Sequence, residues 1–136
     1  MKFRSTVLAM SLAIAALAVA AQASAAGCSY PKAPDKIPDG TTASKEDMIA
    51  GMKAMRAYND LIKQYTDCLK SEHDASAAKI DASPASDKAA QDKKDAQKAD
   101  LDKVLAQKND AAVDAASVVT GRFNDQVKAY NAAHKS

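Results

Sequence analysis

Apolar residues recur between Met48 and Leu69 with the spacing of one α-helical face, and this pattern constrains the fold more than any other feature of the chain. Successive members are separated by four, three, three, four, three and four residues, as expected for a stripe along a helix. Within the stripe an apolar residue returns at every seventh position, which is typical of a helix packed lengthwise against another helix. The stripe consists of Met48, Met52, Met55, Tyr58, Ile62, Tyr65 and Leu69.

Capping and breaking residues indicate where the helices begin and end. Ser44 followed by Asp47 is the pattern of a capping box. Ser83 before Pro84 predicts a break, with Ser83 as the N-cap of a second helix. We therefore expect an all-α fold, a long antiparallel helical hairpin over residues 44–134 with helices at about 44–80 and 84–133. The second helix carries its own core stripe of Leu101, Leu105, Val119, Phe123, Val127 and Tyr130.

The segment before the hairpin, residues 26–43, is rich in proline. Pro31, Pro34 and Pro38 exclude a helix and favour extended backbone. Asp39-Gly40 is a turn signal. This segment is predicted to form an extended arm that docks on the hairpin, because an Ala-rich helix pair buries little apolar area by itself.

Residues 1–25 have the organisation of a secretory signal peptide. Lys2 and Arg4 precede an apolar run of about fifteen residues, and an Ala-x-Ala cleavage pattern ends at Ala25. A transmembrane anchor is the alternative, but a span needs about 20 apolar residues. Export to the periplasm with cleavage near Ala25, and no membrane span afterwards, is the expectation.

Removal of this segment also changes the charge balance. The full chain has 19 basic and 17 acidic residues, and the two numbers become equal once Lys2 and Arg4 are lost. Nucleic-acid binding requires a clustered basic face, and the sequence has no such cluster. No nucleic-acid partner is therefore expected.

The two cysteines, Cys28 and Cys68, suggest a disulfide in an exported protein. Helix from Ser44 to Cys68 spans about 36 Å, and the arm can reach up to about 50 Å when extended. The arm can thus fold back and bring the cysteines together. Alternatively, Ala25-Ala26-Gly27-Cys28 loosely fits a pattern for lipid attachment at Cys28, and the residues alone leave both possibilities open.

Three motifs resemble a group of small, uncharacterised exported proteins of Gram-negative bacteria. They are the arm from Cys28 to Gly40 (Cys-x-Tyr-Pro-x-x-Pro-x-x-Ile-Pro-Asp-Gly), Tyr65-x-x-Cys68-Leu69, and Phe123-Asn-x-x-Val-x-x-Tyr130. The resemblance implies a periplasmic helical protein with a paired cysteine. It implies no established activity, so it assigns no functional residue.

Few residues point to chemistry. Met48, Met52 and Met55 lie on one helical face and are candidate ligands for Cu(I) or Ag(I), which prefer soft sulfur, although methionine also serves as flexible core filler. No catalytic residue or cofactor is predicted. We expect a non-enzymatic periplasmic structural or protein-interaction protein with an unknown protein partner. The alternatives are a chaperone-like or stress protein that binds unfolded clients and a soft-metal-binding protein.

Overall fold

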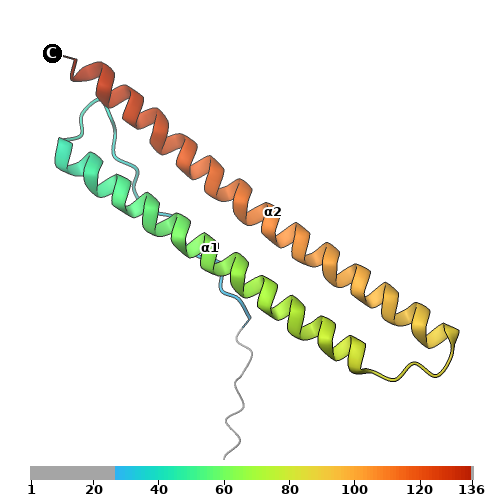
Figure 1. Ribbon diagram of the computed structural model, residues 1–136. Coiled ribbons are helices and arrows are strands. Elements are labelled where there is room, and N and C mark those ends of the chain that lie inside the picture. Colours follow the sequence, from blue (N-terminus) through green and yellow to red (C-terminus); the bar gives the residue numbers. More distant parts are fainter. Residues whose placement is uncertain (1–26, 136) are drawn as a thin grey trace, which may run out of the picture.

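The computed structural model describes residues 27–135, and in this range the chain is all-α. It forms two helices, α1 (Lys45–Ala82) and α2 (Lys88–Ala133). The helices run antiparallel side by side (Figure 1). This confirms the predicted helical hairpin. The predicted signal peptide, residues 1–25, lies outside the described residues.

The first helix begins at the capping box that the sequence predicts. The Asp47 backbone N–H donates to Ser44 Oγ at 3.1 Å, and Ser44 N–H donates to Asp47 Oδ2 at 3.2 Å. The hydrogen bond from the Ser44 hydroxyl, followed by that from its backbone, lowers the pKa of the Asp47 carboxyl. The carboxylate also lies at the positive end of the helix, where negative charge is favourable.

The break between the helices differs from the prediction. Ser83 is the C-cap of α1 and not the N-cap of α2, since its N–H donates to the Ile80 carbonyl at 3.1 Å. Pro84 disfavours helical geometry at the residue before it, and Ser83 is accordingly extended, with ψ of 136°. The first helix therefore continues two residues beyond the predicted end.

The second helix begins at Lys88 instead of at the predicted residue 84. Asp87 is its N-cap, and the Asp87 carboxylate accepts a hydrogen bond from Ala90 N–H at 2.8 Å. An aspartate can satisfy a free N–H group of the first turn and favours the helix dipole. Lys94 Nζ reaches back across the turn to the carbonyls of Asp81 and Ser83, each at 3.0 Å, and so joins the two helix ends.

The core is a narrow seam between the helices. It contains a heptad series from α1, and Ala112 of α2 is completely buried in it. The buried residues are Met48, Met55, Tyr58, Ile62 and Leu69 of α1 and Ala112 and Phe123 of α2. The other predicted core positions, Tyr65, Leu101, Leu105, Val119, Val127 and Tyr130, are half-buried.

Met52 is the predicted core residue that the structure places outside. It is 38% exposed, and its sulfur lies 3.7 Å from Arg56 Nη2, which can donate to it. The second row of the seam runs through Gly51 and Tyr58, which are seven residues apart. Met52 follows Gly51 directly and is thereby turned away from α2.

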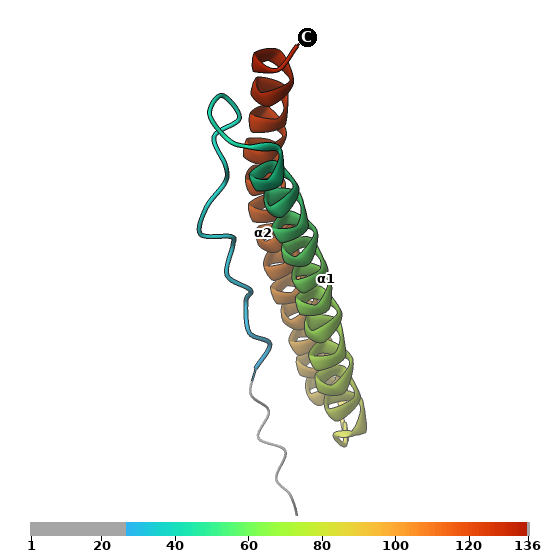
Figure 2. The ribbon, with the colours of Figure 1, turned by 90° about the vertical axis from the view of Figure 1, so that its left-hand side faces the viewer.

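The arm lies along one side of the hairpin (Figure 2). Ala33, Ile37 and Ala43 pack against the buried cluster. Pro38 lies against α1 at Gly51, where an added Cβ would stand 2.8 Å from Pro38 Cγ. The arm thus adds apolar contacts that the two helices alone do not supply.

Candidate functional site

The arm is fastened to α1 by a disulfide between Cys28 and Cys68, with a Cα–Cα distance of 5.8 Å. The two residues are 40 positions apart in the sequence. This confirms the predicted pairing. A Cys28 sulfur that is bonded to Cys68 is not free to carry a lipid.

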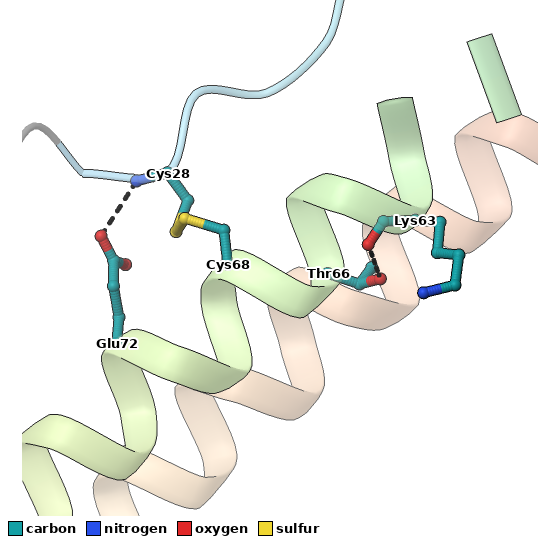
Figure 3. The surroundings of a disulfide bond; sticks show 5 residues. All are labelled: Cys28, Lys63, Thr66, Cys68 and Glu72. Carbon is teal, nitrogen blue, oxygen red and sulfur yellow. Dashed lines mark hydrogen bonds between the residues drawn. A yellow bond between two sulfur atoms is a disulfide. The ribbon is translucent and has the colours of Figure 1, made fainter. Parts of the chain in front are cut away.

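Glu72 lies beside this disulfide, one helical turn after Cys68 (Figure 3). Its Oε1 accepts a hydrogen bond from the Cys28 backbone N–H at 3.0 Å. The two sulfurs and a Glu72 carboxylate oxygen all lie within 4.8 Å of one another. The i, i+4 spacing of Cys68 and Glu72 is the sequence signal for this proximity, because it places both side chains on one helix face.

Aromatic contacts hold the first part of the arm. The rings of Tyr30 and Tyr65 meet edge to face, with centroids 5.2 Å apart. Tyr58 lies in the seam nearby, and its burial, together with the Tyr30 hydroxyl, raises the pKa of Tyr58 to about 12. The Tyr58 phenol therefore stays neutral well above physiological pH.

A buried glycine fastens the other end of the arm to α2. Gly40 N–H donates to Gln126 Oε1 at 2.8 Å. A Cβ at position 40 would stand 1.9 Å from the Gln126 carbonyl oxygen and 2.7 Å from the Tyr130 nitrogen. Both atoms belong to helix backbone and cannot rotate away, so this turn tolerates only glycine.

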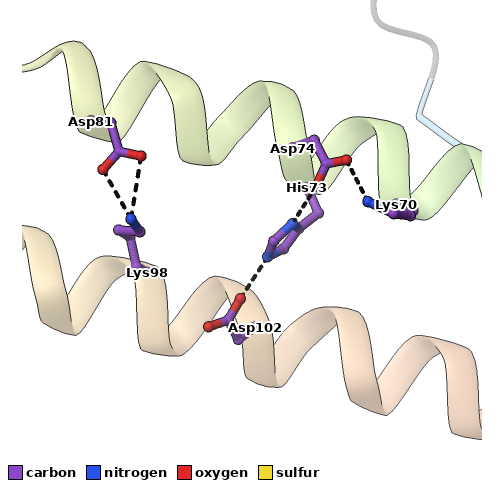
Figure 4. Close-up of polar contacts among 6 residues, drawn as sticks. All are labelled: Lys70, His73, Asp74, Asp81, Lys98 and Asp102. Carbon is purple, nitrogen blue, oxygen red and sulfur yellow. Dashed lines mark hydrogen bonds and ion pairs between the residues drawn. The ribbon is translucent and has the colours of Figure 1, made fainter.

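Polar side chains join the helices near their connected ends (Figure 4). His73 of α1 lies with Nε2 2.6 Å from Asp102 Oδ1 of α2 and with Nδ1 3.2 Å from Asp74 Oδ1. Hydrogen bonds to Asp102 and then Asp74 raise the pKa of His73. Lys98 of α2 likewise bonds the carboxylate of Asp81, at 3.0 and 3.2 Å.

An open groove of about 570 Å³ runs between the helices. Its lining is mixed, with Val113 57% exposed at its edge. The residues that line it are Asn59, Ile62, Lys63, Thr66, Val113, Ala116, Ser117, Thr120, Gly121 and Asn124. None of them belongs to the arm, so the arm does not cover this groove.

A second hollow of about 750 Å³ lies between the arm and the first turns of α1. Arm residues such as Ile37 and Pro38 form one of its walls. It is therefore a gap left by the docking of the arm, whereas the interhelical groove has no covering segment among the described residues.

The three methionines proposed as soft-metal ligands do not share a surface. Met48 and Met55 are 8% and 5% exposed and belong to the seam. Met52 is exposed and its sulfur contacts Arg56. This arrangement fits a core function for Met48 and Met55, and it leaves Met52 as the single accessible thioether of the three.

The two helices, the Cys28–Cys68 disulfide and the Gly40–Gln126 hydrogen bond define the chain as a two-helix hairpin with an arm bound at both of its ends. Neither helix of the described part is long and apolar enough to cross a membrane. The chain matches no protein-family model, no curated protein and no solved structure. The resemblance to exported Gram-negative proteins therefore stays a prediction.

Proposed function

We propose that this chain is an exported, non-enzymatic protein-interaction protein that binds a helix of a partner protein in the interhelical groove. The observation that carries this proposal is Gly121. It lies inside α2, where glycine costs about 1 kcal/mol relative to alanine. An added Cβ would meet nothing within 4 Å, so no contact among the described residues requires a glycine there.

A glycine on an exposed helix face permits close approach of another backbone. The neighbouring groove residues Ser117 and Thr120 are small and polar, so a partner helix could approach closely and also form hydrogen bonds. A mixed lining of this kind suits one defined partner. An unfolded client, as a chaperone would bind, is better served by a broader apolar surface.

Photo-crosslinking tests the groove directly in the cells that make the protein. A photoreactive residue at Val113 should yield one defined adduct, and Gly121→Leu should abolish it by filling the approach path. The control is the same residue at Gln107, which is exposed and does not line the groove. Equal adducts at the two positions, or none at Val113, would remove the basis of the proposal. A broad ladder of adducts at Val113 would favour client binding instead.

Export is tested separately by the intact mass of the protein recovered from the periplasm. We expect a chain that begins after Ala25 and lacks two hydrogen atoms relative to the reduced form, because the cysteines are paired. Recovery of the chain with residues 1–21 still attached would contradict cleavage. A thioether-linked lipid on Cys28 would instead support the lipoprotein alternative.

A further inference from the structure

We propose that Cys28, Cys68 and Glu72 form a zinc-binding site when the disulfide between the two cysteines is reduced. The three side chains come from the arm and from α1, and Figure 3 shows the carboxylate and the disulfide on the same side of that helix. The proposal is independent of partner binding in the groove.

The donor set suits zinc. Two thiolates and one carboxylate are common zinc ligands, at about 2.3 Å for sulfur and about 2.0–2.2 Å for oxygen. Two ligands on a tetrahedral zinc therefore stand about 3.5 Å apart. The two sulfurs and a carboxylate oxygen already lie within 4.8 Å of one another, so small side-chain rotations suffice. Water would complete the fourth position.

The helix positions two of the ligands. Cys68 and Glu72 are four residues apart in α1, a spacing that directs both side chains to one face. Glu72 Oε1 is already held by the Cys28 N–H at 3.0 Å. This hydrogen bond would orient the carboxylate as an outer-shell partner does in metal sites. Its other oxygen has no hydrogen-bond partner among residues 27–135 and can face the metal.

The remaining contacts of the arm keep Cys28 in place after the disulfide opens. The Tyr30–Tyr65 ring contact lies two residues beyond Cys28. At the far end, Gly40 N–H stays bonded to Gln126. The two thiols would therefore be held close together, which lowers the entropy cost of binding a metal between them.

A dithiol is the reductant that opens the Cys28–Cys68 disulfide. The dithiol supplies two electrons and two protons, the Cys28–Cys68 bond breaks, two thiols form, and the dithiol becomes a disulfide. Zinc then displaces both thiol protons to solvent, and each sulfur donates an electron pair to the metal. Metal binding thus competes with reoxidation for the same two sulfurs.

The test compares the mature chain in reduced and oxidised form under anaerobic conditions. Zinc affinity is measured by competition with a chromogenic chelator, and Co²⁺ reports thiolate ligation by its charge-transfer absorption. We expect one equivalent bound by the reduced chain, none by the oxidised chain, and loss of the cobalt band in Cys68→Ser. Glu72→Gln should weaken zinc binding at least about tenfold.

Glu46→Gln is the matched control, since Glu46 lies in the first turn of the same helix, far from the cysteines in sequence. It should bind zinc as the wild type does. Circular dichroism of each variant checks that the hairpin is intact. The site is refuted if the reduced wild type binds no more tightly than a chain with both cysteines replaced by serine. Equal affinities of Glu72→Gln and Glu46→Gln would also refute it, because Glu72 would then not be a ligand.

Discussion

Replacing Gly40 with alanine should strongly destabilise the protein. The added methyl group would stand 1.9 Å from the Gln126 carbonyl oxygen and 2.9 Å from the carbon of that carbonyl. The atoms belong to the backbone of α2, so the strain cannot be relieved by rotating a side chain. The turn of the arm must move away from α2, and the hydrogen bond from Gly40 to Gln126 Oε1 is then lost.

The expected cost follows from two contributions. Overpacking of a well-packed contact costs about 1–3 kcal/mol, and the lost hydrogen bond contributes about 1 kcal/mol. The free energy of unfolding should therefore fall by about 2–4 kcal/mol. For a domain of about 100 residues, this corresponds to a decrease in Tm of roughly 10–20 °C.

Gly121→Ala is the matched control for this experiment. Both substitutions add one methyl group, but at position 121 the new Cβ meets nothing within 4 Å. Because alanine favours a helix over glycine by about 1 kcal/mol, Gly121→Ala should raise the Tm by several degrees. Urea and thermal denaturation followed by circular dichroism, with the disulfide intact, measure both effects. An unchanged or increased Tm in Gly40→Ala would refute the close packing of the arm against α2.

Three further predictions concern the seam and the links between elements. Met55→Ala should lower the free energy of unfolding by about 2–5 kcal/mol because Met55 is buried, whereas Met52→Ala should lower it by less than about 1 kcal/mol because Met52 is exposed. Similar losses for the two variants in urea denaturation would place both residues in the core. Replacing Cys28 and Cys68 with serine should lower stability by about 4 kcal/mol, as expected for closing a loop of this length, and an unchanged melting curve would mean that the disulfide constrains nothing. Because the pKa of His73 is raised in the folded protein, protonated His73 should stabilise the fold fully below pH 6.5, the ordinary pKa of histidine, and this stabilisation should be lost as the pH rises through the folded pKa. His73→Gln should remove this contribution, and identical pH profiles of Tm for the two proteins would contradict it.

The local sequence pattern was sufficient to predict the two helices and the arm. Apolar residues repeated at helical spacing between Met48 and Leu69, and this period by itself favours a helix with one buried face. The Ser44 capping box was readable because its two partners are only three residues apart. The reach of an extended arm likewise showed that Cys28 and Cys68 could meet.

Two points could be decided only from the tertiary structure: which of two possible N-caps begins the second helix, and which residue of the apolar stripe is exposed. Ser83 and Asp87 are both acceptable N-caps, and the choice fell on Asp87 because Ser83 is held by the end of α1. Met52 matched the helical period, but the contact between two helices is narrower than the stripe. Only the actual crossing of α1 and α2 decides which edge of the stripe is exposed.

The candidate sites show the same division. The sequence by itself determined that this chain would form two long helices with a proline-rich arm, because helix period and proline geometry are local properties, whereas the reach of the arm showed only that Cys28 and Cys68 could pair. Glu72 beside the disulfide, His73 against Asp102 and Gly40 against Gln126 were decided by tertiary structure alone. Gly40 and Gln126 are 86 residues apart, and no local preference records which residues will meet across such a distance.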